Sequence, residues 1–377
     1  MATYSVKLIC SLAGFLQLTL SFSSSLAEAC RLKEVSDMAC PFLEEPVDIE
    51  AQILRRNLRR ERVIRPRLDV LSFPDDHLFE RYRFSAQSII HLNNILSPHI
   101  VHMTHRGHGL SSEQILCVAL RFFANGSFLY NIGDSEHISK ATICWAVRNV
   151  TLGLKRLLYT FVVFPSHRPT RLIKELFHRI AGFPGVIGCI DGTHIPIAAP
   201  SVNEGDYVNR KSFHSINVQI ICDAAHIISN VEAKWPGSVH DSRMFHECTL
   251  SARFAHGESN GYLLGDRGYP CQPYLLTPYP DPGPQQHYNL AHCRTRARVE
   301  MTIGMLKARF QCLRRLRVTP DRACDIIVAC AILHNIATIR GEQCPTQPVN
   351  DPDNDPDHPT DARDGRAVRD TICYLHF

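Results

Sequence analysis

The spacing of hydrophobic residues divides the chain into a helical first half and a mixed second half. From 79 to 158 the apolar positions recur at helical spacing. Within that region, residues 127–150 (SFLYNIGDSEHISKATICWAVRNV) predict two short helices around a turn at Gly133-Asp134, with Ser139 capping the second. These are the proportions of a helix-turn-helix, but any helical hairpin has the same pattern, so both interpretations stay open.

After Pro184 the pattern changes from helix to strand. The predicted strands are 185–197, two strands within 215–235 around a turn at Asp223–His226, and 261–266, while the predicted helices are 171–180, 294–311 and 324–338. Consecutive strands come first, and a further strand then precedes the last helices. This order of elements predicts a mixed sheet with helices on its faces. The fold class is therefore α/β, preceded by an all-α region that resembles a helix-turn-helix.

Composition divides the chain into four segments. We expect a leader-like extension over 1–50, a helical DNA-binding region with an arginine-rich arm over 51–165, a catalytic α/β domain over 166–340 and an acidic tail over 341–377. The tail contains the run DPDNDPDHPTDARDG. Because this run is too polar and too rich in proline to pack, we expect the tail to be disordered.

The N-terminus and the cysteines favour different compartments. Residues 1–30 have one lysine, an apolar run and Ala27-Glu28-Ala29 in a cleavage-like position, which is typical of a secretory signal or of a helical extension. The fifteen cysteines are odd in number and form no CxxC pair, which indicates reduced thiols inside a cell. The uncharged stretch 84–105 is interrupted by four histidines and Pro98, so we expect no membrane span.

Positive charge is concentrated outside the tail. The net charge is +4, although the tail alone holds eight acids against three arginines, so the rest of the chain favours a polyanionic partner. Residues 55–67 hold seven arginines, which indicates a solvated helix or an arm on DNA phosphates, and 294–317 hold eight basic residues against one acid. The residues expected to contact DNA are Arg55, Arg56, Arg59, Arg60, Lys140, Arg148, Arg298 and Lys307.

Four acids are candidate ligands of a metal ion. Asp191 lies within an apolar strand, Asp266 ends another, Asp241 follows a Pro-Gly break, and Glu300 lies on a helix. A buried carboxylate is costly unless it is paired or bound to metal, and hard cations such as Mg²⁺ or Mn²⁺ prefer oxygen ligands. Each acid also has a plainer interpretation, as a turn or cap residue or, for Glu300, as a partner of Arg296. Zinc is disfavoured because no Cys–His cluster has ligand spacing.

Six motifs, in order, resemble the PIF/Harbinger transposase family, and especially its host-domesticated nuclease branch. They are DGTHIPI (191–197), YVNRKSFHSINVQIICDA (207–224), WPGSVHDSRMF (235–245), LLGDRGYP (263–270), RARVEMTIGMLKARF (296–310) and ILHNI (332–336). The resemblance covers about residues 55–340. It implies an RNase H-like core of the DDE type, with Asp191, Asp266 and Glu300 as catalytic metal ligands and Asp241 as a further acid beside the metals.

The resemblance also implies partners and a location. DNA is the expected substrate, and a Myb-like DNA-binding protein is the expected partner for targeting and nuclear import; homo-oligomerisation stays open. We expect the nucleus, and also the cytoplasm, as the location. The leader-like N-terminus is no part of the family pattern, so secretion stays as the alternative.

Together these features predict a metal-dependent DNA endonuclease of transposase descent. In a two-metal mechanism, one metal held by Asp191 and Asp266 would activate water, and a second, shared with Glu300, would stabilise the leaving 3′ oxygen. The alternative is a catalytically silent, transposase-derived DNA-binding regulatory protein. A secreted phosphoesterase is a third hypothesis, suggested only by the leader.

Overall fold

The computed structural model describes residues 69–100, 109–280, 283, 285–345 and 360–377. The predicted extension over 1–50 and the arginine arm, with Arg55, Arg56, Arg59 and Arg60, lie outside the described residues. Leu68–Phe377 belongs to one compact unit, so the boundary predicted at residue 165 falls within a unit.

A five-stranded mixed sheet forms the centre of this unit. Its strands are β1 (Val186–Pro196), β2 (Ser215–Cys222), β3 (Ile228–Pro236), β4 (Tyr262–Leu264) and β5 (Leu275–Leu276), in the spatial order β3-β2-β1-β4-β5. β1 is antiparallel to β2 and parallel to β4, which confirms the predicted mixed sheet. The turn between β2 and β3 forms because Asp223 Oδ1 accepts the N–H groups of Ala225 at 2.8 Å and Ile227 at 2.9 Å.

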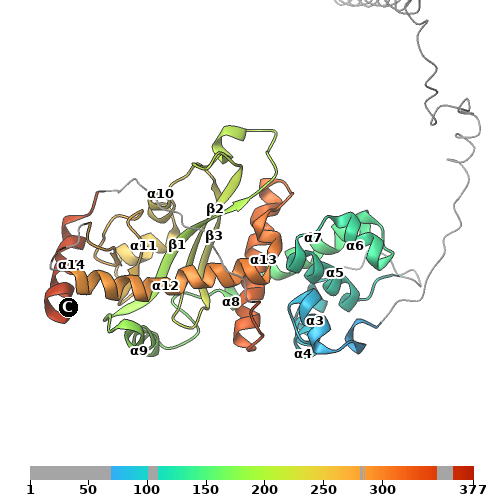
Figure 1. Cartoon of the computed structure of the whole chain (residues 1–377), viewed down its shortest axis with the longest axis horizontal. Coiled ribbons are helices and arrows are strands. Elements are labelled where there is room, and N and C mark those ends of the chain that lie inside the picture. The colour runs from blue at the N-terminus through green and yellow to red at the C-terminus, as the bar shows by residue number, and fades with distance from the viewer. Residues whose placement is uncertain (1–68, 101–108, 281–282, 284, 346–359) are drawn as a thin grey trace, which may run out of the picture. The chain divides into compact units, whose positions relative to one another are not determined.

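Helices cover both faces of the sheet. One face carries α9 (Thr170–Ala181), α12 (Gln286–Arg309) and α13 (Pro320–Ile339), and the other carries α10 (Asp241–His246) and α11 (Thr249–Ala255) (Figure 1). Side chains alternate along β1, so Cys189 belongs to the core under α12, whereas Ile190 belongs to the core under α10 and α11. α12 begins at Gln286, before the start predicted at 294.

The all-α region precedes the sheet and packs against α13. Its helices are α3 (Asp75–Tyr82), α4 (Ala86–Leu96), α5 (Ser112–Asn125), α6 (Leu129–Glu136), α7 (Lys140–Arg156) and α8 (Leu158–Phe161); short 3₁₀ turns cover Val70–Ser72, Ser97–His99, Glu204–Tyr207 and Gln311–Arg314. Ser139 caps α7 as predicted, because its Oγ accepts the Thr142 N–H at 3.2 Å. α6 and α7 form a helical hairpin, but the turn predicted at Gly133-Asp134 is wrong, because both residues lie within α6 and the chain turns at His137, which has a φ of 54°. Gly133 instead allows a close approach of the Ile138 carbonyl, since a Cβ there would lie 2.6 Å from that oxygen. The role of the hairpin as a DNA-binding helix-turn-helix stays a prediction.

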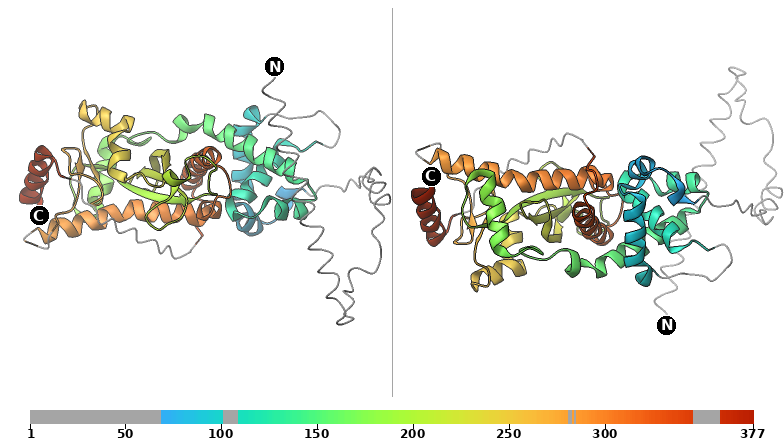
Figure 2. Two further views of the ribbon diagram at one scale, coloured as in Figure 1. Left: turned by 90° about the horizontal axis from the view of Figure 1, so that it is seen from above. Right: turned by 90° about the horizontal axis from the view of Figure 1, so that it is seen from below.

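The predicted disorder of the tail is wrong for residues 360–377. α14 (Arg363–His376) is helical and lies at the end of the sheet next to β5 (Figures 1 and 2). Ile372 is buried, and the Phe377 ring lies 5.4 Å from the Phe183 ring, centroid to centroid. Composition misled here because a few apolar residues at helical spacing suffice to seat a short helix on an existing core.

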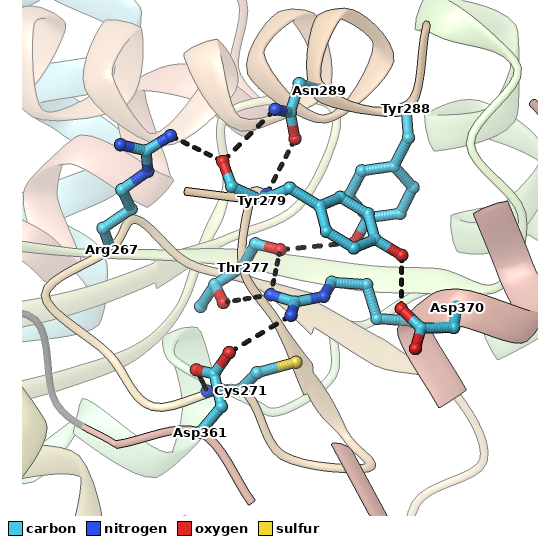
Figure 3. A network of polar contacts seen from close by, with 9 residues as sticks. Arg267, Cys271, Thr277, Tyr279, Tyr288, Asn289, Asp361 and Asp370 are labelled. Atoms are coloured by element: carbon cyan, nitrogen blue, oxygen red, sulfur yellow. Dashed lines mark hydrogen bonds and ion pairs between the residues drawn. The ribbon is translucent and has the colours of Figure 1, made fainter. Parts of the chain in front are cut away.

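Polar contacts fix α14 to the chain around β5. Arg369 is only 4% exposed; its Nη2 pairs with Asp361 at 3.2 Å and its Nη1 donates to the Thr277 carbonyl at 3.4 Å. The Tyr279 hydroxyl donates to Asp370 at 2.6 Å (Figure 3). The buried guanidinium is therefore paired, which removes much of the cost of burying a charge.

Two further predictions concern membranes and thiols. Among the described residues, α13 is the one helix long and apolar enough to cross a membrane by length and composition, and most of it is buried inside the protein. It holds Asn335, whose Nδ2 donates to the Ile228 carbonyl at 2.7 Å within the core. The cysteines that the structure describes are all free, in agreement with the predicted reduced thiols.

Candidate active site

Two acids come to the same end of the sheet, beyond the C-terminal residue of β4. The pairing between β1 and β4 reaches Cys189 opposite Leu264, so Asp191 lies beyond the last residue of β4. Asp266 follows β4 after Gly265, and its Oδ1 accepts the Gly268 N–H at 3.0 Å. Because β1 and β4 are parallel, Asp191 and Asp266 come to the same end of neighbouring strands, as the sequence predicted.

α12 adds a cation and a third acid to this edge. Arg296 and Glu300 are one helical turn apart. Arg296 Nη1 lies 3.2 Å from Asp191 Oδ2, and Nη2 pairs with Glu300. The side chains of Asp191 and Arg296 are 17% and 18% exposed, whereas that of Glu300 is 52% exposed. The predicted pair of Glu300 with Arg296 is therefore present, and Arg296 also joins it to Asp191.

Asp241 approaches β1 from the opposite face. It is the first residue of α10, and Asn217 Nδ2 on β2 donates to its Oδ1 at 2.8 Å. A Cβ on Gly192 would lie 2.3 Å from Asp241 Oδ2, so the carboxylate occupies the space of a missing side chain. Since Asp191 and residue 192 point to opposite faces of β1, Asp241 and Asp191 flank the strand from its two sides.

The closeness of the acids to one another and their burial raise their pKa values. Burial raises the pKa of Asp191 to about 8; Arg296 opposes that rise, while Asp266, Asp241 and Glu300 add to it. Burial also raises the pKa of Asp266, again against Arg296. The single guanidinium therefore compensates the acids only in part, and a further cation at this point would be stabilised.

A buried phenol shares the electrostatic environment of the acids. Tyr269 is 1% exposed, and its hydroxyl has no hydrogen-bond partner within the described part of the chain. Burial, and then Asp241, Asp266 and Asp191, raise the pKa of Tyr269 well above its ordinary value, so the hydroxyl stays protonated. Sequence reasoning did not select Tyr269, although it lies in the same GDRGYP motif as Asp266.

The donor set fits a hard divalent cation. Asp191, Asp241, Asp266 and Glu300 offer carboxylate oxygens, which Mg²⁺ and Mn²⁺ prefer. Among the residues that the structure describes, no three His, Cys, Asp or Glu side chains are already arranged as a ligand cluster. Arg296 holds Asp191 and Glu300 as ion-pair partners, and Asp241 lies on the other side of β1 against Gly192. Glu300 is half exposed, so it has room to exchange Arg296 for a cation.

The residues predicted to contact DNA differ in exposure and in their partners within the protein. Lys140 is exposed at the start of α7, with Nζ 4.5 Å from the centroid of the Tyr130 ring. Arg148 is paired with Asp325 of α13, so its charge has a partner inside the protein rather than in a groove. Arg298 is partly exposed, and its Nη1 donates to His226 Nε2 at 3.0 Å.

The expected phosphate contact of Lys307 does not agree with the structure. Lys307 is only 7% exposed, and its neighbours Leu306 and Ala308 are 1% and 2% exposed. This end of α12 packs between the sheet, α13 and the turn at Gln311–Arg314, and is therefore covered on several sides. The spacing from Glu300 was correct for the helix face, but it could not show which later elements cover that face.

Comparison with known proteins identifies the family. Residues 190–335, which include Asp191, Asp241, Asp266 and Glu300, match the family described as "DDE superfamily endonuclease". Over 286 residues the chain is 35% identical to "Putative nuclease HARBI1" of Rattus norvegicus and 34% identical to the protein of that name in Homo sapiens, covering 74% of this chain and 82% of each relative. It is 29% identical to "Protein ALP1-like" of Arabidopsis thaliana over 252 residues, 61% of each chain.

No solved structure matches the chain. The order and spacing of the acid-bearing motifs, the mixed sheet that brings Asp191 and Asp266 to one edge, and the extent of the likeness agree with one another. The chain belongs to the Harbinger transposase-derived nuclease family, within the DDE superfamily endonucleases.

Proposed function

We propose that this protein is a metal-dependent DNA endonuclease of transposase descent that hydrolyses phosphodiester bonds, with Asp191, Asp266 and Glu300 as its catalytic acids. One arrangement carries the proposal: Asp191 lies largely buried on β1, Asp266 follows the parallel strand β4, and Arg296 joins Asp191 to Glu300. Burial raises the pKa of Asp191 to about 8, and Asp266, Asp241 and Glu300 all contribute to that rise. Membership of the DDE family supports both the nuclease reaction and an RNase H-like assignment of the α/β domain.

The finer proposal is a two-metal DDE mechanism. Asp191 and Asp266 would hold one Mg²⁺ or Mn²⁺ ion and Glu300 would share a second, with Asp241 as a further ligand, and the ions would supply positive charge to the reacting phosphodiester. β1 fixes the backbone of Asp191, and the Gly268 N–H orients Asp266. Arg296, once released by the acids, stays beside them and can donate to a phosphate oxygen of the substrate.

Plasmid nicking tests the assignment. Purified full-length protein is incubated with supercoiled DNA in Mg²⁺ or Mn²⁺, with EDTA as the metal-free control. We expect Asp191→Asn, Asp266→Asn and Glu300→Gln to abolish nicking without loss of DNA affinity. Glu258→Gln serves as the matched control, because Glu258 is an exposed acid paired with Arg253, and this variant should cut like the wild type. Equal cutting by the wild type and Asp191→Asn would refute the proposal.

A catalytically silent DNA-binding regulatory protein is the second candidate. Arg296 favours it, because its guanidinium already compensates Asp191 and Glu300 in the absence of metal. In that case the purified protein binds DNA in EDTA but produces no nicked plasmid in either metal ion. The nicking assay therefore separates the two candidates.

We further propose that a Myb-like DNA-binding protein acts as the partner and that the protein works in the nucleus and the cytoplasm. The family resemblance supports both. Imaging of the tagged full chain, with and without the arginines of 55–67, tests the location. Tagged protein in the medium with residues 1–29 removed would instead establish secretion.

A further inference from the structure

A pocket lined by arginines lies on the flank of α12 that faces away from Arg296. Its volume is about 410 Å³, and Arg168, Arg179 and Arg298 line it together with Ala224 and Ala225 of the turn between β2 and β3. Arg179 is on α9 and Arg298 is on α12, which run side by side (Figure 1). Because successive helical residues are about 100° apart, Arg298 points roughly opposite to Arg296.

In the part of the chain that the structure describes, no acid forms an ion pair with the arginines of this pocket. Within the described residues, Arg168 and Arg179 have no ion-pair or hydrogen-bond partner, and both are exposed. The acid nearest in sequence to the lining turn is Asp223, which uses its carboxylate to accept the N–H groups of Ala225 and Ile227 and the Ser166 hydroxyl. The pocket therefore presents three guanidinium groups to a ligand.

A neutral histidine holds Arg298 in place. Arg298 Nη1 lies 3.0 Å from His226 Nε2, and His226 Nδ1 lies 3.0 Å from Thr302 Oγ1. Burial, and then the charge of Arg298, lowers the pKa of His226, so the imidazole is neutral. Its Nε2 accepts from Arg298, and its Nδ1–H donates to Thr302. Arg298 is thus oriented without losing its net charge.

A second pocket adjoins the first. Its volume is about 520 Å³, and Arg168 and Ala225 line both pockets. Phe161, Ile227 and Ile339 also line the second pocket. An anion seated on the arginines would therefore have space beside it for a larger attached group, such as a nucleoside.

We propose that this arginine pocket binds a backbone phosphate of the DNA strand, at a site separate from the catalytic acids. Planar guanidinium groups match the two free oxygens of a phosphodiester. Arg179 lies on α9, Arg298 lies on α12, and Arg168 lies in the segment just before α9. A strand held here and at Asp191 would cross α12, so the pocket would set how the strand lies relative to the point of cleavage. This inference rests on the proposed DNA substrate and deepens it.

Charge-matched variants test the pocket. Arg168→Gln and Arg179→Gln remove pocket charges, whereas Arg171→Gln removes a charge from α9, the helix of Arg179, at a side chain that is 91% exposed and pairs with Glu175. Binding of fluorescein-labelled DNA to the full chain is measured by anisotropy in EDTA over a range of salt. We expect each pocket variant to lose affinity by about tenfold and to flatten the dependence of log K on log salt by about one unit.

The controls distinguish a pocket contact from a general charge effect. Arg171→Gln should bind like the wild type, and Arg179→Lys should recover part of the affinity, because lysine keeps the charge but not the planar fork. Thermal melting shows whether each variant is folded. Pocket variants that are folded and bind DNA as tightly as Arg171→Gln would overturn the proposal.

A second measurement distinguishes DNA from a free anion. Inorganic phosphate is titrated while the melting temperature is followed. If it stabilises the wild type and Arg171→Gln but not Arg179→Gln, while all three bind DNA equally, the site takes a small anion and the DNA proposal fails. Because binding is measured in EDTA, a failure here leaves the nuclease proposal intact, and a failure of the nicking assay leaves this one intact.

Discussion

Arg296 on α12 joins Asp191 on β1, with Nη1 3.2 Å from Oδ2, to Glu300 on its own helix. This guanidinium is the counter-charge of the acids in the metal-free protein. We expect Arg296→Gln to lower the free energy of unfolding in EDTA by on the order of 3 kcal/mol, because a partly buried acid loses its partner. Urea denaturation measures this change, and Arg294→Gln, an exposed neighbour on α12, is the control.

The same variant should respond more strongly to metal. Without Arg296, added Mn²⁺ has no internal cation to displace, so its stabilising effect should exceed that in the wild type. An Arg296→Gln protein that is as stable as the wild type in EDTA and gains no more from Mn²⁺ would show that Arg296 is not the counter-charge.

The stability of the metal-free protein should fall as the pH rises. Burial raises the pKa of Asp191 from 3.8 to about 8, so the folded state holds this proton more tightly than the unfolded state. The resulting stabilisation is fully present below about pH 4 and is lost as the pH rises through about 8. Urea midpoints in EDTA across this range should decline for the wild type and less steeply for Asp191→Asn. Equal slopes would contradict the assignment of the proton to Asp191.

Gly192 should be needed to keep Asp241 in place. A Cβ there would lie 2.3–2.5 Å from the carboxylate atoms of Asp241. We expect Gly192→Ala to displace Asp241 from β1 and to reduce nicking as much as Asp241→Asn does. Gly205→Ala is the matched control, since nothing lies within 4 Å of its added Cβ. If Gly192→Ala cuts normally while Asp241→Asn does not, the packing of Asp241 on β1 is not what positions it.

The Tyr269 hydroxyl should cost stability in the metal-free protein. It is buried without a partner among the described residues, beside three acids. Tyr269→Phe should therefore be neutral or stabilising by about 1 kcal/mol in EDTA, whereas Tyr269→Ala should be destabilising by about 3 kcal/mol or more, because a cavity is left. Melting curves in EDTA measure both. A clear loss of stability in Tyr269→Phe would mean that the hydroxyl has a bonding partner in solution.

α14 should stabilise the end of the sheet beside β5. A Cβ on Gly365 would lie 2.4 Å from the Cys271 carbonyl oxygen, so Gly365→Ala should displace α14 from the chain around β5. Ile372→Ala should cost about 2–4 kcal/mol of unfolding free energy, because it opens a cavity in a buried contact. Thr371→Ala, at an exposed position of the same helix, is the control. Limited proteolysis that cuts α14 equally in all of these variants would argue against this docking.

Periodicity predicted the centre of the sheet well because β1 and β2 are long and largely apolar. β1 and β2 fall within the predicted ranges, and β3 ends one residue beyond its range, at Pro236. The turn at Asp223 has the carboxylate that its N–H groups require. β5 has only two residues, and such a short strand is defined by its partner β4 rather than by a pattern of its own. The tail was misjudged for the same reason, since α14 is stabilised by contacts with Thr277 and Phe183 that are distant in sequence.

For the site, the sequence by itself determined which acids to consider: an aspartate within an apolar strand, another at a strand end, and a glutamate on a basic helix, in the order typical of one family. Only the tertiary structure decided how they meet. It placed Asp191 and Asp266 at one edge, set Asp241 on the far face of β1 and put Arg296 among them. It also buried Lys307 and left Arg168 and Arg179 without partners among the described residues. The physical reason is that burial and electrostatic pairing depend on neighbours far away in sequence, whereas a local pattern reports only the face of one element.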